Sequence, residues 1–355
     1  MGLSALEKRL NYLETSIQMW LSSAELKQAV EKTIESGVDR SDVVFALRQV
    51  KEKCTADELE FWLSTSYQDD ADLKNVLVLH AGNLPLVGFQ DVIAVYLSGA
   101  QYRGKISKRD PWLLPSFLTI LKRIDKTFKG RWSTDLDMFR DLEADHLMFA
   151  GSPDTLPKIE KQLVDKEIIT PDCKKLIRTA KFSITYLGSE PNERFHQLVE
   201  AIERYRGEGC RSVKVIVAPF SLYDHSCHLT DYFESYWTET QTNHDPEDAT
   251  LHRIAYNKSI ERPQMRLEHL LIEESEPENF EKDRVYWVNG GFEKISELLD
   301  KYGEQIQAVY SFSEDLEALN QHLHDEKEAE DIATAQRPPI YWKPDGVDVL
   351  EWLTA

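Results

Sequence analysis

Cysteine and long apolar runs are scarce in this sequence, and each shortage excludes a class of protein. The four cysteines of the 355-residue chain, Cys54, Cys173, Cys210 and Cys227, are widely scattered and make no paired framework. This argues against a disulfide-stapled secreted fold, and we expect a reducing, cytoplasmic location. No apolar run approaches the ~20 residues that cross a bilayer, and the charged N-terminus lacks a secretory apolar region, so we expect no membrane span.

Basic charge is also in short supply. The chain has 42 Lys and Arg residues against 62 Asp and Glu residues, which gives a formal net charge of −20. We therefore expect no nucleic-acid partner, because phosphate backbones bind basic surfaces. An anionic ligand has to be held by a local basic cluster, against the field of the whole chain.

The sequence does contain a clear alternation of helical and strand-like segments. Apolar residues recur at helical spacing through residues 6–21 and 42–63. Short strands are then predicted in VLVL, AQYRGKI, DHLMFAG, KFSITYLGS and VKVIVAP, with helix-like segments between them. This alternation indicates an α/β fold with a mostly parallel sheet covered on both faces. Asn83, Lys105 and Ser152 fall at predicted strand ends, where open parallel sheets bind ligands.

Four regions are expected along the chain. They are a helical N-terminal region (1–70), a nucleotide-cofactor-binding α/β domain (71–190), a catalytic α/β domain (191–335) and a C-terminal tail that packs back on the body (336–355). The stretch between Thr238 and Lys282 is acidic and poorly patterned, and we expect a mobile loop or an extended hairpin there. A hydrophilic helix is predicted from Glu314 to Glu330.

Cys210 has the sequence surroundings of a reactive thiol. Gly207 and Gly209 give the preceding turn a backbone that can approach a substrate closely. Arg211 and Lys214 follow at once, and nearby positive charge lowers a thiol pKa toward the nucleophilic thiolate. The alternative is a small buried hydrophobe at the start of a strand, which is the common role of a free cysteine. The local sequence leaves both interpretations open.

Four segments, in the same chain order, resemble the aldehyde dehydrogenase superfamily. Asn83 to Leu86 (Asn-x-Pro-Leu) is similar to its oxyanion segment, and GAQYRGKISKRDP is similar to its cofactor strand. Phe-x-Gly-Ser at Phe149 to Ser152 is similar to its phosphate-side turn, and Gly207 to Cys210 is similar to its nucleophile loop. The acyl-CoA reductase branch, related to the fatty-acid reductase of bacterial bioluminescence, is the closer match through AGNLPL, GCRSVKV and AQRPPIY…DGVDVLEWL.

The resemblance implies an aldehyde-dehydrogenase-like fold, with a Rossmann-type cofactor domain and a catalytic domain that carries Cys210 as nucleophile. Asn83 would be the oxyanion donor, together with the backbone N–H of Cys210. The implied cofactor contacts are Lys105, Ser107, Lys108, Gly151 and Ser152. A homo-oligomer is the usual assembly of the superfamily, and no feature of this sequence establishes it.

The cofactor segment has a basic residue where the superfamily places an acidic residue that selects NAD. Lys105 matches the lysine at the strand end, and Lys108 and Arg109 stand at and after the selecting position. A basic pair suits a 2′-phosphate, so we expect NADPH, with NADH as the alternative. A solvated basic loop also fits these residues, and the Gly151-Ser152 turn is also a common helix cap with no ligand.

One departure from the family pattern bears on the reaction. Hydrolytic aldehyde dehydrogenases carry a glutamate that activates water at the strand end where this chain has Tyr186. Without that base, attack of water on a thioester would be slow, which favours reduction of an acyl-CoA or acyl-carrier-protein thioester to an aldehyde. Glu190 and Glu193 lie nearby in sequence and could substitute for the missing base. Two alternatives therefore stay open, an aldehyde dehydrogenase that forms acid and a degenerate, non-catalytic partner subunit.

Two histidine-containing segments are not expected to carry chemistry. His225, Cys227 and His228 lie within four residues, but no second ligand pair at zinc spacing occurs elsewhere, so we expect no metal site. His80 precedes the Asn83 turn, and we expect it to cap the strand in a satisfied hydrogen bond.

Overall fold

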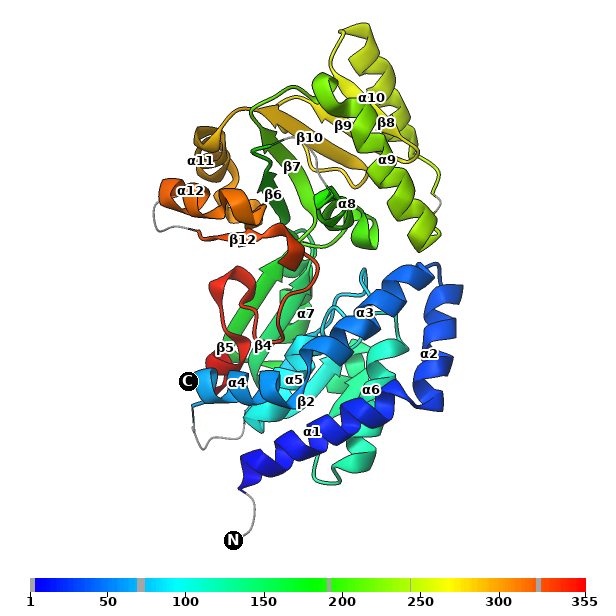
Figure 1. Cartoon of the computed structure of the whole chain (residues 1–355). Coiled ribbons are helices and arrows are strands. Elements are labelled where there is room, and N and C mark those ends of the chain that lie inside the picture. The colour runs from blue at the N-terminus through cyan, green and yellow to red at the C-terminus, as the bar shows by residue number, and fades with distance from the viewer. Residues whose placement is uncertain (1–3, 69–73, 190–192, 243, 324–326) are drawn as a thin grey trace. The chain divides into compact units, whose positions relative to one another are not determined.

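The computed structural model describes the chain except for residues 1–3, 69–73, 190–192, 243 and 324–326 and the side chains of residues 224–228. The backbone forms two compact units (Figure 1), residues 1–180 with 338–355 and residues 181–337. The division falls before the predicted domain boundary at residue 190. The reason is that the strand Phe182–Tyr186 pairs with strands of the second unit.

The first unit begins with four helices: α1 (Ala5–Leu21), α2 (Ala24–Glu35), α3 (Arg40–Lys53) and α4 (Ala56–Ser66). Local capping explains where three of them start. Ser4 and Glu7 form a reciprocal capping box at α1, and the Ser23 and Thr55 side chains accept backbone N–H groups at α2 and α4. The helices bury large side chains, among them the fully enclosed Trp20 and Trp62. Packing of these apolar faces stabilises helices that would be marginal alone.

A five-stranded parallel sheet in the order β3-β2-β1-β4-β5 forms the centre of the first unit. Its strands are β1 (Asn75–Leu79), β2 (Gln101–Lys105), β3 (Arg131–Ser133), β4 (Ala144–Gly151) and β5 (Ile169–Thr179). The connecting helices are α5 (Phe89–Ser98), α6 (Leu113–Ile124) and α7 (Leu156–Asp165). The chain builds outward from β1 in one direction through β2 and β3, and then in the other through β4 and β5. This reversal is a topological switch point beside β1.

Helices cover both faces of this sheet (Figure 1), as the alternation along β1 shows. Val76 and Val78 join the core that contains α1, α5 and α6, whereas Leu77 and Leu79 join a core with Leu163 of α7. Successive residues of a strand point to opposite faces, so an unbroken apolar run means that both faces are buried. The predicted α/β architecture with a parallel sheet is confirmed.

The C-terminal segment, residues 338–355, belongs to the first unit. Its helix α13 (Val349–Thr354) contacts α5 and α4. The buried Asp348 carboxylate caps this helix and also accepts hydrogen bonds from the Trp62 indole at 3.0 Å and the Ser66 hydroxyl at 2.7 Å. These bonds tie the end of the chain to α4.

The second unit contains a seven-stranded sheet in the order β12-β11-β6-β7-β10-β9-β8. Its strands are β6 (Phe182–Tyr186), β7 (Val213–Ala218), β8 (Gln264–Leu267), β9 (Leu270–Glu274), β10 (Arg284–Asn289), β11 (Ile306–Ser311) and β12 (Ala329–Asp331). Its helices are α8 (Phe195–Glu203), α9 (Leu222–Thr240), α10 (Asp248–Ser259), α11 (Phe292–Tyr302) and α12 (Ser313–Leu323). The β8–β9 pair is antiparallel, and the other pairs are parallel.

Two stretches of the second unit differ in part from their predicted form. The acidic stretch between Thr238 and Lys282 does hold a hairpin, the short antiparallel pair β8–β9, but it also holds the helix α10, which was not predicted. The helix predicted from Glu314 to Glu330 ends at Leu323, and β12 follows it at the edge of the sheet. A three-residue strand next to a polar helix carries too little apolar periodicity to be recognised from sequence.

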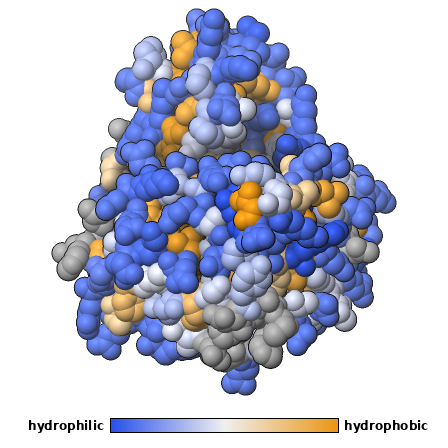
Figure 2. Space-filling model, turned by 90° about the horizontal axis from the view of Figure 1, so that it is seen from above, coloured by the Kyte–Doolittle hydropathy of each residue, from blue (hydrophilic) through white to orange (hydrophobic). Residues whose placement is uncertain are grey.

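Hydrophilic residues predominate on the face of the molecule in Figure 2, and hydrophobic residues occur there in small separate groups. Within the described residues, the structure contains no helix with the length and apolar character that crossing a membrane requires.

Candidate functional site

The C-terminal ends of β1, β2 and β4 lie in register at one edge of the first sheet. Leu79 at the end of β1 pairs with Lys105 of β2 and with Phe149 of β4. The segments after these strands carry the candidate residues of this unit, which are Asn83, Lys105, Ser107, Lys108, Gly151 and Ser152. The structure therefore brings these six residues to one sheet edge, at the switch point where parallel sheets bind nucleotides.

Asn83 is exposed on the loop between β1 and α5. The loop turns tightly, because Leu86 adopts a left-handed conformation (φ 58) and its carbonyl accepts the Phe89 N–H at 2.9 Å. Gly82 packs against the loop that follows β2, where any Cβ at position 82 would overlap the Ser107 hydroxyl. Close contact between the two loops thus places Asn83 beside the candidate cofactor segment.

Beneath this edge lies a buried pair that the sequence analysis missed. The His80 Nε2 and the Tyr102 hydroxyl are 2.7 Å apart, and both side chains are buried. Burial lowers the pKa of His80 to about 4, so its ring is neutral near pH 7. The predicted hydrogen bond of His80 is therefore to a side chain of the neighbouring strand. The sequence signal for it is Gly104, because a Cβ there would overlap the Tyr102 hydroxyl.

The segment after β2 presents positive charge to solvent. Lys105 is about half buried, and burial followed by the nearby Lys108 lowers its pKa. Lys108 and Arg109 are exposed, and neither forms an ion pair with a described residue. Ser107 is partly buried and accepts the Arg109 backbone N–H at 3.2 Å. Three cationic side chains therefore stand at this sheet edge in a chain of high negative charge.

The Gly151-Ser152 turn follows β4 and leads into α7. The Ser152 hydroxyl accepts the Asp154 N–H at 3.3 Å, and the Ser152 carbonyl accepts the Thr155 N–H at 3.1 Å. A Cβ on Gly151 would lie 2.7 Å from the Phe149 ring, so a larger residue here would require that ring to shift. The turn is stabilised by its own bonds, and the cofactor role of Gly151 and Ser152 stays a prediction.

Cys210 lies in the second unit, in a turn that leads directly into β7. Its backbone carbonyl accepts the hydroxyl of Ser183, a buried residue of β6, at 3.0 Å. Its side chain is partly exposed, whereas Cys54 and Cys173 are buried. Burial raises the pKa of Cys54 to about 12 and that of Cys173 to about 11, which makes both thiols poor nucleophiles. Cys210 is the most accessible of these three cysteines.

The cationic neighbours of Cys210 in sequence have other partners in space. Arg211 donates to the Ala335 carbonyl at 2.6 Å and pairs with Glu330 at 2.9 Å. Lys214 is buried and donates to the Lys282 carbonyl. Sequence proximity alone therefore does not establish that these charges act on the thiol.

Tyr186 ends β6, the strand that holds the Cys210 carbonyl near its other end. Its ring packs on Phe292, with 4.4 Å between ring centroids. Burial first, and then the nearby Asp315 and Glu293, raise the pKa of Tyr186. Asp315 accepts the N–H of Gly188 at 3.2 Å and was not found from sequence, because α12 brings it from far along the chain. Glu190 lies outside the described residues, as do the side chains of His225, Cys227 and His228.

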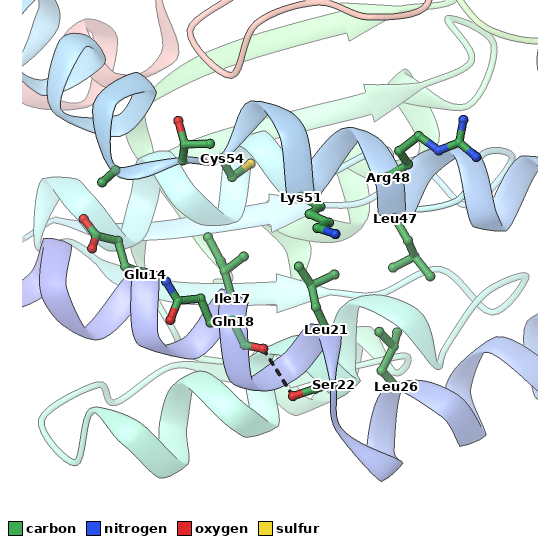
Figure 3. Close-up of a pocket in the computed structure, with 12 residues that line it drawn as sticks. Glu14, Ile17, Gln18, Leu21, Ser22, Leu26, Leu47, Arg48, Lys51 and Cys54 are labelled. Atoms are coloured by element: carbon green, nitrogen blue, oxygen red, sulfur yellow. Dashed lines mark hydrogen bonds between the residues drawn. The ribbon is translucent and has the colours of Figure 1, made fainter.

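A separate pocket of about 700 Å³ lies among the N-terminal helices (Figure 3). Its walls come from α1, α2 and α3 and are mainly apolar, with Ile17, Leu21, Leu26 and Leu47, and Lys51 points from α3 into the space between α1 and α3. No residue of the predicted site lines it. The pocket has the size of a small-molecule site, and it is separate from the candidate residues at the edge of the first sheet.

Comparison with known proteins identifies the fold. No family model and no curated protein sequence matches the chain. Among solved structures, aldehyde dehydrogenase 21 from Physcomitrella patens, in complex with succinate, aligns with a TM-score of 0.68 at 13% identity, over 100% of this chain and 84% of that one. The aldehyde dehydrogenase KauB from Pseudomonas aeruginosa aligns at 0.68 and 12% identity, over 93% and 77% of the two chains.

Glyceraldehyde-3-phosphate dehydrogenase GapN from Methanocaldococcus jannaschii, complexed with NADP, aligns at 0.60 and 13% identity, over 93% and 81% of the two chains. These structures are members of the aldehyde dehydrogenase superfamily. The chain has the aldehyde-dehydrogenase-like fold, as the resemblance of its short segments implied.

Proposed function

We propose that this protein is an NADPH-dependent reductase that converts an acyl thioester, carried on CoA or acyl carrier protein, into an aldehyde. The observation that carries the proposal is the placement of Cys210. It is a partly exposed thiol on a loop with left-handed backbone, at the start of a central strand of an aldehyde-dehydrogenase-like fold. A thiolate there can attack a carbonyl carbon and form a covalent acyl-enzyme.

The residues have defined roles in this proposal. The Cys210 thiolate attacks the thioester carbonyl, the carbon–sulfur bond to the carrier breaks, and the carrier thiolate leaves with a proton from solvent. As the resemblance to the aldehyde dehydrogenase superfamily implies, the Asn83 amide and the Cys210 backbone N–H would donate to the oxygen that becomes negative in the tetrahedral intermediate. When bound, NADPH supplies the hydride that reduces the acyl group, and release of Cys210 then yields the aldehyde.

The sheet edge of the first unit suits a dinucleotide phosphate. Lys105, Lys108 and Arg109 provide positive charge where the fold binds nucleotides, and the two exposed cations have no carboxylate partner among the described residues. Lys108 and Arg109 would bind the 2′-phosphate, Lys105 and Ser107 the ribose, and Gly151 and Ser152 the pyrophosphate. The basic pair favours NADPH over NADH.

Tyr186 supports the proposal of reduction over oxidation to acid. A phenol with a raised pKa is a poor base for water, so an acyl-enzyme here would hydrolyse slowly. The alternative function is an aldehyde dehydrogenase that forms acid. It is supported by Asp315 and Glu293 near Tyr186, because either carboxylate could activate water. A cytoplasmic location and a homo-oligomer complete the proposal.

The first test is the intact mass of the protein after incubation with acyl-CoAs of increasing chain length, without NADPH. We expect one acyl adduct on the native protein and on Cys173→Ala, and none on Cys210→Ala. Cys173 is the matched control, because it is a cysteine with a buried side chain outside the proposed chemistry. Absence of an adduct with every thioester, on a folded protein, would contradict reductase chemistry.

A further inference from the structure

The strand that follows Cys210 contains a β-bulge, and the extra residue of that bulge is Lys214. Ser183 of β6 pairs with Val213, but the next residue, Ile184, pairs with Val215. Bulges redirect side chains and are common beside functional sites. Like every residue of β7, Lys214 is buried in the second unit, and only 6% of it is exposed.

The Lys214 ammonium lies against the loop that leads to Cys210. A Cβ placed on Gly207 would be 2.8 Å from the Lys214 Nζ, so the ammonium packs directly on the Gly207 backbone. The same Nζ donates to the backbone carbonyl of Lys282. The Lys282 side chain in turn pairs with Glu208 at 3.0 Å. Lys214 and Lys282 thus enclose residues 207–208, immediately before Cys210.

This loop needs support because of its backbone. Tyr205 (φ 58, ψ 30), Arg206 (φ 55, ψ 33) and Gly207 (φ 64) are three successive residues in the left-handed region. Left-handed backbone is unfavourable for residues other than glycine and persists only where surrounding contacts determine it. The Lys214 ammonium is one such contact, and it acts from beneath the turn.

A buried ammonium also needs compensation. Burial lowers the pKa of Lys214 to about 8, while Asp283, Glu203 and Glu208 oppose that shift. Glu203 accepts hydrogen bonds from the Trp237 indole at 3.0 Å and from the His269 ring at 3.1 Å. The charged and titratable groups that act on this cluster are Glu203, Arg206, Glu208, Glu247, His269, Lys282 and Asp283.

We propose that Lys214 is a positioning residue, whose ammonium holds residues 205–207 in the left-handed turn that presents Cys210. The expected effect of Lys214 on catalysis rests on the proposed function, whereas its expected effect on the Cys210 thiol does not. Two variants test it. Lys214→Met keeps the length and removes the charge and donor, and Gly207→Ala introduces a Cβ against the Nζ. Lys258→Met is the control, because Lys258 is exposed on α10 and has no ion pair with a described residue.

The decisive measurement is the rate of Cys210 alkylation by iodoacetamide from pH 6 to pH 10, with circular dichroism to confirm folding. In the native protein and in Lys258→Met we expect an inflection near pH 8, where Lys214 loses its proton, in addition to titration of the thiol. Lys214→Met should lack this inflection. Profiles of Lys214→Met and Gly207→Ala that superimpose on the native profile would overturn the proposal.

The catalytic part is measured separately, as the rate of acyl-adduct formation from an acyl-CoA. We expect at least a tenfold slower rate in Lys214→Met, with the half-saturating acyl-CoA concentration changed less than twofold. If no acyl-CoA forms an adduct even on the native protein, the proposed function fails while the alkylation profile still decides the role of Lys214. If Lys214→Met does not fold, Lys214→Gln, which removes the charge but keeps a hydrogen-bond donor, provides the same two readouts.

Discussion

The two groups of candidate residues, one in each unit, are held in place by different physical means. At the sheet edge of the first unit, there is glycine-dependent close packing of the loops above a neutral buried pair, and two of the three cations, Lys108 and Arg109, are exposed. At the loop that leads to Cys210 in the second unit, buried charges surround a left-handed backbone. The candidate cofactor edge can thus be formed by local geometry, whereas the Cys210 loop depends on contacts with residues far away in sequence.

The largest expected effect concerns the exposed loop of the first unit. Asn83→Ala should slow acyl-adduct formation about 10²–10³-fold, because loss of one oxyanion donor costs ~3–4 kcal/mol in the transition state. Single-turnover mass spectrometry measures this rate, with Asn11→Ala on the exposed face of α1 as the control. An Asn83→Ala rate within twofold of the native rate would mean that Asn83 takes no part in acyl transfer.

The buried His80–Tyr102 pair should make the folding stability depend on pH below neutrality. Because the folded pKa of His80, about 4, is below the ordinary 6.5, the unfolded chain binds the proton first as pH falls. Folding stability should therefore decrease between pH 6.5 and pH 4, by about 3 kcal/mol from this group. Urea unfolding at several pH values measures the slope, which should become shallower in His80→Phe. An unchanged slope in that variant would mean that His80 is already charged in the fold.

The close approach of two loops can be tested with one methyl group. Gly82→Ala forces its Cβ onto the Ser107 hydroxyl, and the adjustment should cost ~1–3 kcal/mol of stability and weaken NADPH binding. Gly303→Ala is the matched control, since nothing lies within 4 Å of its Cβ and its φ is negative. Thermal unfolding and NADPH fluorescence titration measure both effects. Equal effects of the two substitutions would contradict a specific role for the close contact between Gly82 and Ser107.

The smallest expected effect is on cofactor choice. Lys108→Ala should raise the Kd for NADPH about tenfold, ~1.4 kcal/mol, and leave the Kd for NADH within twofold, because only NADPH carries the 2′-phosphate. The exposed Lys126→Ala is the control for general loss of positive charge. A parallel loss of affinity for both dinucleotides would contradict assignment of Lys108 to the 2′-phosphate.

The grouping of candidate residues at one edge of the first sheet could be predicted from sequence, because it follows from where each strand ends. The predicted strands end shortly before Asn83, Ser107 and Ser152, and the ends of parallel strands meet at one edge. Edge strands were harder to recognise. In β5 the buried residues Ile169, Cys173 and Leu176 are separated by three and then by two other residues, instead of alternating, and this hides its strand character.

The surroundings of Cys210 could not be predicted in the same way. Sequence proximity suggested that Arg211 and Lys214 act on the thiol, but their observed partners, Ala335 and Lys282, are 124 and 68 residues away. The shift of register at Lys214 depends on pairing with β6, which a single strand sequence does not reveal. Asp315 reaches Gly188 across 127 residues for the same reason.

The fate of the acyl-enzyme tests the central claim most directly. A Cys210 adduct prepared with an acyl-CoA and freed of excess reagent would be divided between buffer and buffer with NADPH, and its products quantified. The account predicts a persistent adduct in buffer, and stoichiometric aldehyde with free Cys210 after NADPH. Release of carboxylic acid at the same rate in buffer and in buffer with NADPH, without aldehyde in either sample, would contradict this prediction. Such a result would identify an enzyme that transfers acyl groups to water.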